Sequence, residues 1–142
     1  MIPKYLIDTS ALIRVIRGQV DPAWIRYADQ ANFAICEPVL FEFVQGSGKR
    51  AAKQIEADLL SSHQWVPLSD KVGSRMRDLR RDLTERSMHT MLGLADYLIA
   101  ATAIQDGFVL LHEDADFSAA ARHHPYLSEQ RISQTLPEDL TN

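Results

Sequence analysis

Four acidic residues of this chain stand where carboxylate side chains can do chemistry: Asp8, Glu42, Asp96 and Asp114. Asp8 directly follows the apolar residues 5–7 and precedes two hydroxyl residues, which predicts a short buried strand that ends in a carboxylate and leads into a helix. Asp114 follows another apolar run, residues 108–111. Because parallel strands bring their carboxyl ends to one edge of an α/β sheet, where such sheets bind ligands, we expect both carboxylates at that edge.

The other two acids are expected on helices. Glu42 lies inside the predicted helix 38–44 with apolar neighbours, where an ionised carboxylate is costly unless a cation compensates its charge. Asp96 begins residues 96–105, which are apolar almost all round, as in a helix that packs on more than one side. Together with the two strand ends, these positions predict a cluster of carboxylates at one edge of the sheet.

Each acid also has an ordinary structural explanation. Asp8 and Asp96 could each cap the N-terminus of a helix, and Asp114 and Asp116 could be loop acids or caps of the last helix. Glu113, in the same run, shows that not every acid there need matter. As a cluster, however, the carboxylates would repel one another and raise each other's pKa values unless a divalent ion held them charged.

The ligand chemistry of this cluster narrows the choice of ion. Oxygen ligands select hard cations, so the acids indicate Mg²⁺ or Mn²⁺ rather than zinc. Such an ion can polarise a phosphodiester, lower the pKa of a bound water and stabilise the leaving oxygen, and no covalent nucleophile is needed. Thr9 and Ser10, beside Asp8, could add hydroxyl or backbone N–H contacts to a ligand water or a phosphate.

The elements that must position these acids alternate between strand and helix. We expect strands at residues 4–7, 33–36 and 108–111, a strand or extended linker at 65–68, and a last edge strand around Ile132. Helices are expected at residues 10–17, 21–31, 38–44, 49–62, 71–86, 96–105 and 117–122, with a mobile loop or bent helix at 87–93. Strands separated by helices predict an α/β fold with a mainly parallel central sheet flanked by helices on both faces.

Length and composition indicate one globular domain. With 142 residues, the chain is long enough for one hydrophobic core but too short for a second independent domain. We expect a single domain over residues 1–136 and a short tail at 137–142. The one cysteine, Cys36, excludes a disulfide framework, and neither a signal sequence nor a membrane-spanning apolar run is present, so we expect a soluble, cytoplasmic protein.

The net charge of −4 argues against indiscriminate binding of nucleic acid, but residues 71–86 hold six cations against three acids. Apolar residues recur in this segment at helical spacing, and Ser69 and Asp70 precede it as a cap. The segment is either an ordinary solvated helix face, with Asp78 paired to Arg81 and Asp82 to Arg86, or a surface that contacts phosphates.

Four stretches of the chain resemble, in order, the successive motifs of a known family: LIDTSALI at residues 6–13, PVLFEFVQG at 38–46, ADYLIAATAIQDG at 95–107 and FVLLHEDADFSAAA at 108–121. They are similar to the motifs of PIN domains, most closely those of VapC toxins from bacterial VapBC toxin–antitoxin pairs. The resemblance implies a three-layer PIN-like (Rossmann-like) fold. It also implies a metal-dependent endoribonuclease, in which Mg²⁺ or Mn²⁺ activates the water that cleaves RNA.

The resemblance assigns roles to the four acids. Asp8, Glu42, Asp96 and Asp114 stand at the positions of the family's catalytic acids. The three aspartates are expected to contact the metal directly or through water. Glu42 is expected to orient a metal-bound water or to bind a second ion.

Further residues and partners follow from the same resemblance. Asp116 matches an additional acid of the last motif, and Ser10 matches a hydroxyl beside the site. Glu113 departs from the basic or neutral residue of many relatives, and it would either weaken the approach of RNA or have no effect. The implied partners are an RNA substrate, with tRNA and rRNA as candidates and residues 71–93 as its guides, a second copy in a homodimer, and a cognate VapB-type antitoxin that blocks the active groove.

Other classes of protein match the sequence less well. A phosphatase or phosphotransfer enzyme of the haloacid dehalogenase type needs a second aspartate where this chain has Ser10, and a receiver domain needs a late lysine, whereas none follows Lys71. A dinucleotide-binding module would need a G-x-G-x-x-G motif, which is missing. The remaining alternative is a catalytically inactive PIN-like scaffold that binds proteins, which predicts no metal-dependent turnover.

Overall fold

The computed structural model describes residues 4–134, in which five strands and seven helices alternate. The strands are β1 (Tyr5–Ile7), β2 (Phe33–Cys36), β3 (Gln64–Val66), β4 (Val109–His112) and β5 (Glu129–Arg131). The helices are α1 (Thr9–Ile16), α2 (Pro22–Asp29), α3 (Glu37–Gln45), α4 (Lys49–Ser62), α5 (Val72–Thr84), α6 (Leu94–Asp106) and α7 (Ala115–His123). The expected domain boundary at residue 136 and the tail at 137–142 lie outside the described residues.

The strands form one parallel sheet in the order β3-β2-β1-β4-β5. The chain runs outwards from β1 through β2 to β3, then crosses back to add β4 and β5 on the other side of β1. The gap between the carboxyl ends of β1 and β4 is therefore the topological switch point, where sheets of this kind bind ligands. The predicted α/β fold with a parallel sheet is confirmed.

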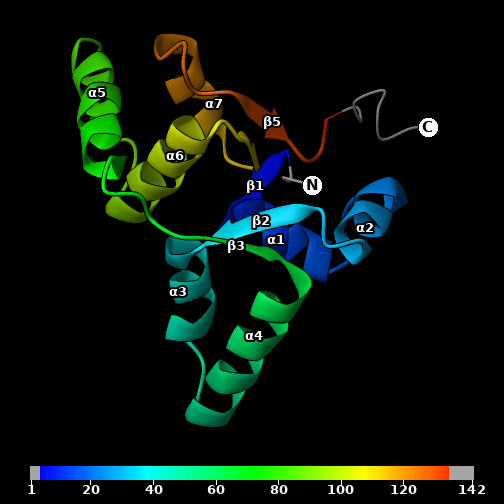
Figure 1. Ribbon diagram of the computed structural model, residues 1–142. Coiled ribbons are helices and arrows are strands. Elements are labelled where there is room, and N and C mark those ends of the chain that lie inside the picture. Colours follow the sequence, from blue (N-terminus) through cyan, green and yellow to red (C-terminus); the bar gives the residue numbers. More distant parts are fainter. Residues whose placement is uncertain (1–3, 135–142) are drawn as a thin grey trace.

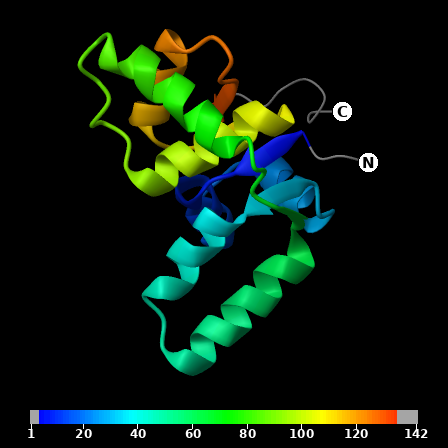
Figure 2. The same cartoon turned by 60° about the vertical axis from the view of Figure 1, so that its left-hand side comes forward.

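The helices fall into groups that follow from this strand order. Right-handed crossovers place the helices that connect β1, β2 and β3 on one face and those that lead to β4 and β5 on the other. Figure 1 shows α5, α6 and α7 gathered together, while α3 and α4 form a helical hairpin that extends away from the sheet. Figure 2 shows the same separation from a second direction.

The core explains why the central strands form where they do. Every residue of β1 and β2 is buried, and Trp24 of α2 packs edge-on against Tyr5, with ring centroids 5.4 Å apart. In α6, residues 99–101 and 103 are also fully buried, as the all-round apolar pattern predicts. Within residues 4–134, no helix combines the length and apolar character that crossing a membrane requires.

Several local expectations are refined by the structure. The segment 65–68 contributes Trp65 and Val66 to β3, whereas Ile132 lies just beyond β5 and donates its N–H to the His112 carbonyl (2.8 Å). Residues 87–93 form turns rather than a bent helix, and the Tyr97 hydroxyl donates to the carbonyl of His89 (2.7 Å). Whether this segment moves stays a prediction.

The basic helix is shorter than expected but keeps its predicted buried stripe. It begins at Val72, and just before it the Ser69 hydroxyl accepts the N–H of Lys71 (3.1 Å). Arg81 pairs with Asp78 at 3.6 Å, as expected. The expected pair between Asp82 and Arg86 is wrong: Asp82 instead lies 2.7 Å from Nδ1 of the buried His124, because α7 packs against α5.

Candidate active site

Asp8 lies at the switch point, with 4% of its surface exposed. Its N–H donates to the carbonyl of Leu111 on β4 (3.0 Å), which fixes the end of β1 against its neighbour. Its Oδ1 accepts the hydroxyl of Ser10 (2.7 Å) and the N–H of Ala11 (3.2 Å), so it caps α1. The carboxylate of Asp8 therefore both caps a helix and lies within the electrostatic reach of the other acids, two roles that the sequence left as alternatives.

Asp114 and Asp96 are also at helix N-termini. Asp114 caps α7 by accepting the N–H of Asp116 (2.8 Å), and Asp96 lies in the first turn of α6, hydrogen bonded to the main chain of Gly93. Three helices thus begin beside the switch point, and the positive ends of their dipoles favour negative charge there. These N-termini attract a phosphate less than uncapped ones would, because the aspartates already occupy them.

Glu42 is placed differently from the expectation. It is exposed, and Phe41 beside it is 54% exposed, so the argument that Glu42 is buried among apolar residues is wrong. In α3 the buried face is formed by Val39 and Leu40, whereas residues 41 and 42 turn to solvent. Glu42 nevertheless lies beside Asp8, because its Oε1 accepts the hydroxyl of Thr9 (2.9 Å) at the start of α1, and its role in the site stays a prediction.

The electrostatics show that the acids act on one another. Burial, together with the charges of Asp96 and Asp114, raises the pKa of Asp8 to about 7, against the lowering effect of its two hydrogen bonds. Burial also raises the pKa of Asp96, with further contributions from Asp114, Glu42 and Asp116. The structure therefore brings all five predicted acids into one electrostatic environment, in which the charged form of Asp8 is disfavoured.

Glu113 turns away from the site that its neighbours form. Its side chain is 7% exposed and accepts the Ser133 hydroxyl (2.8 Å) and an Arg131 N–H (3.3 Å). Burial works to raise the pKa of Glu113, but these partners outweigh it and hold the pKa below its ordinary value. Its main-chain N–H donates to the hydroxyl of Ser10 (2.9 Å), so Ser10 bridges the ends of β1 and β4. No local pattern indicates these contacts, since Glu113 and its partners Ser10, Arg131 and Ser133 are far apart in the chain.

His112 lies beside the acids but was not singled out from the sequence. It is fully buried at the end of β4, with Nδ1 3.0 Å from the N–H nitrogen of Asp114 and Nε2 3.0 Å from Oε2 of Glu129. A histidine immediately before an acidic loop was the available signal. Its contact with β5 could not be foreseen, because the strand itself was only loosely predicted.

The residues of the site suit a hard divalent cation in their chemistry. The donors are carboxylate oxygens, and the raised pKa of Asp8 means that a nearby cation would favour its charged form. Among the described residues, no three His, Cys, Asp or Glu side chains converge closely enough to hold an ion. The carboxylates thus influence one another electrostatically, but they do not form a complete coordination shell. The predicted assignment of metal ligands stays a prediction.

A parallel sheet with acids at its switch point and on the adjoining helices defines the class of this protein. The sequence pattern of the PIN domain matches residues 5–123, so the chain belongs to the PIN-domain family. Its curated relatives narrow this to the VapC family of toxin ribonucleases. Ribonuclease VapC17 of Mycobacterium tuberculosis is 29% identical over 92% of this chain and 96% of its own length, and ribonuclease VapC11 of the same species is 30% identical over 82% and 91%. Nucleases of this kind are generally metal-dependent.

Solved structures agree on the fold. VapBC2 from Rickettsia felis, bound to a promoter DNA fragment, matches with a TM-score of 0.69 and 24% identity, covering 89% of this chain and 97% of that one. VapBC-1 from nontypeable Haemophilus influenzae matches with a TM-score of 0.74 and 14% identity, covering 92% and 98%. At these identities the likeness concerns the fold, and it confirms the predicted PIN-like architecture.

Proposed function

We propose that this chain hydrolyses phosphodiester bonds of RNA at the cluster of Asp8, Asp96 and Asp114, with Mg²⁺ or Mn²⁺ as its cofactor. The observation that carries the proposal is the electrostatic coupling of these carboxylates around the β1–β4 switch point: the charges of Asp96 and Asp114 raise the pKa of Asp8, and the charge of Asp114 raises the pKa of Asp96. Such repulsion between buried carboxylates is costly for a fold and is typical of a site that binds a cation.

The four acids have separate roles in this proposal. Asp8, Asp96 and Asp114 hold the cation, which when bound supplies positive charge to the phosphate and lowers the pKa of water. Glu42, fixed by Thr9 at the exposed rim, orients the attacking water or holds a second cation. Water oxygen bonds to phosphorus, the P–O3′ bond breaks and the 3′ oxygen takes up a proton, which leaves a 5′-phosphate and a 3′-hydroxyl.

The test is cleavage of RNA by the purified chain. An RNA with an exposed single-stranded loop should be cut in Mg²⁺ or Mn²⁺ and left intact in excess chelator. Asp96→Asn should abolish cleavage, whereas the matched control Asp106→Asn, an exposed acid at the other end of α6, should cleave normally. Equal cleavage in chelator, or by Asp96→Asn, would refute the proposal. No metal-dependent turnover by the wild-type chain would favour the scaffold alternative.

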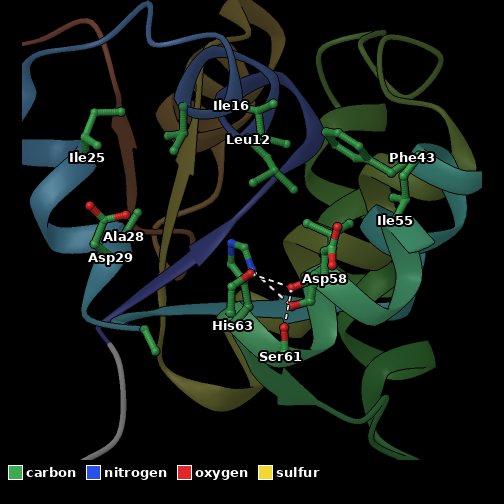
Figure 3. A pocket seen from close by; sticks show the side chains of 14 residues that line it. Leu12, Ile16, Ile25, Ala28, Asp29, Phe43, Ile55, Asp58, Ser61 and His63 are labelled. Carbon is green, nitrogen blue, oxygen red and sulfur yellow. Dashed lines mark hydrogen bonds between the residues drawn. The ribbon is translucent and has the colours of Figure 1, made fainter. Parts of the chain in front are cut away.

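A VapB-type antitoxin is the proposed partner, and an apolar groove supports it. A cavity of about 810 Å³ lies between α1, α2 and α4, and its walls include Leu12, Ile16, Phe43 and Ile55 (Figure 3). Ile16 is 61% exposed, an unfavourable state for a large aliphatic side chain that a partner's apolar segment would relieve. None of the four acids lines the groove, but α1, which lines it with Leu12 and Ile16, begins at its cap Asp8, so a partner segment that follows α1 would lead from the groove to the acids.

Binding of the antitoxin can be tested separately from catalysis. Ile16→Glu should prevent co-purification with the protein encoded by a neighbouring small reading frame, because it places a charge in the groove. Leu60→Glu is the matched control, since Leu60 is 42% exposed on α4 but does not line the cavity. Retained co-purification of Ile16→Glu would locate the partner elsewhere.

A homodimer in the cytoplasm completes the proposal. Phe41, Leu68 and Leu94 are large, exposed apolar side chains around a hollow of about 270 Å³ whose lining is almost wholly apolar. A second copy packed on this surface would bury them and would bring two acidic sites near each other. Light scattering on a Leu68→Glu variant tests this: a monomer is expected, and an unchanged dimer mass would place the interface elsewhere.

A further inference from the structure

The His112 side chain forms a rigid link between the edge strand β5 and the acidic loop. Its Nδ1 accepts the N–H of Asp114 (3.0 Å), so the proton of the neutral ring lies on Nε2, which donates to Glu129 (3.0 Å). The ring also packs edge-on against Phe117, with centroids 5.3 Å apart. A ring held at both nitrogens and one edge has a single orientation.

We propose that Glu129 and His112 are positioning residues for the acidic site. Glu129 sets the tautomer and orientation of the His112 ring, and the ring fixes the main chain of Asp114 at its place beside Asp8. Neither residue touches RNA or the cation in this scheme. The inference rests on the proposed function and adds to it two residues behind the acids, supplied by the last two strands, β4 and β5.

Hydrogen bonds on both sides of residues 113 and 114 fix the position of Asp114 relative to Asp8. On one side, the Ser10 hydroxyl joins the Asp8 carboxylate to the main chain of Glu113. On the other side, the next residue, Asp114, donates its N–H to His112, which reaches Glu129. The relative position of the two carboxylates is thus set by side chains from β4, α1 and β5 and not by the loop alone.

The burial of these groups argues for a role beyond holding the fold together. A polar ring that is 0% exposed and makes only two hydrogen bonds contributes little net stability compared with an apolar side chain of similar size. The Glu129 side chain is 20% exposed, so water can replace its carboxylate when it is removed, and the sheet should survive that substitution. Removing the Glu129 carboxylate therefore leaves the His112 ring free to rotate.

The experiment compares Glu129→Ala with Glu129→Gln in the full chain, using Mn²⁺ as the probe. Titration calorimetry without RNA should show that Glu129→Ala binds Mn²⁺ about tenfold more weakly, because outer partners of metal ligands typically have effects of this size. The kcat for RNA should fall similarly while KM stays unchanged. Glu129→Gln, whose amide oxygen still accepts from Nε2, should keep most of the affinity. Gln130→Ala is the control on the same strand, since within residues 4–134 its side chain bonds to Arg131 and Gln134 and not to His112.

Nitrogen NMR of the wild-type ring adds a readout that needs no variant. The ring should be protonated at Nε2 and bare at Nδ1, and the opposite tautomer would overturn the inference. So would an Mn²⁺ affinity of Glu129→Ala equal to that of the wild type, or equal losses in the Ala and Gln variants. If the wild type binds Mn²⁺ but cleaves no RNA, the proposed function fails, while the affinities and the tautomer still decide the positioning role.

Discussion

Replacing Asp8 by asparagine should stabilise the metal-free protein, and should do so more at high pH than at low pH. The amide keeps an oxygen that can accept both the Ser10 hydroxyl and the Ala11 N–H, and asparagine is as good an N-cap as aspartate. What the substitution removes is the charge of a carboxylate that is only 4% exposed. The variant thus separates the cost of that charge from the structural role of the side chain.

The size of the effect follows from the pKa of Asp8, which burial and the neighbouring acids raise from 3.8 to about 7. Between these values the folded protein holds a proton that the unfolded chain releases, so the free energy of unfolding falls as the pH rises from about 4 to about 7. At about 1.4 kcal/mol per pH unit, Asp8 costs about 4 kcal/mol at pH 8 and about 2 kcal/mol at pH 5. The advantage of Asp8→Asn over the wild type should therefore be larger at pH 8 by about 2 to 3 kcal/mol.

Urea denaturation in chelator at pH 5 and pH 8 measures this difference. Asp21→Asn is the matched control, because Asp21 caps α2 in the same way but is exposed, so this substitution removes no buried charge. Adding Mn²⁺ at pH 8 should stabilise the wild type and not the Asp8→Asn variant. An equal free-energy change for Asp8→Asn at the two pH values would refute the reasoning about the charge of Asp8.

Three further predictions concern single side chains. Thr9→Val removes the hydroxyl that holds Glu42, so kcat for RNA should fall while the thermal midpoint stays unchanged, as kinetics and calorimetry can check. Gly107→Ala should cost about 1 kcal/mol in urea denaturation, because Gly107 ends α6 at φ 75°, whereas Gly73→Ala inside α5 should be neutral or stabilising. Burial raises the pKa of the Cys36 thiol to about 12, so a thiol reagent at pH 8 should react with it only after urea unfolds the chain.

The parts of the fold that the sequence predicted well are those with strong local patterns. Strands β1 and β2 and most of β4 are short uninterrupted apolar runs, which is typical of strands buried on both faces. The edge strands β3 and β5 have no such pattern, since Gln64–Val66 is largely exposed and Glu129–Arg131 is polar. They are strands because their neighbours β2 and β4 offer unpaired main-chain groups, which is information that lies elsewhere in the chain.

The residues of the site also differ in how far local sequence patterns indicate them. Asp8, Asp96 and Asp114 were found because strand ends and helix starts are visible in the sequence. The environment of Glu42 was misjudged because neighbours in a helical sequence point in different directions. The bond between His112 and Glu129 spans elements whose contact depends on the finished sheet, so no local pattern could have indicated it.

The strand order also determines when, during synthesis, this nuclease can first become active. Asp8 emerges from the ribosome early, but β1 gains its partner β4, and Asp8 its neighbour Asp114, only when most of the chain has been made. Until then an incomplete chain lacks Asp114 and holds Asp8, Glu42 and Asp96 on an unfinished sheet. Growing or prematurely ended chains should therefore leave the RNA around them intact, and cleavage should begin only with chains that have been translated beyond Asp114.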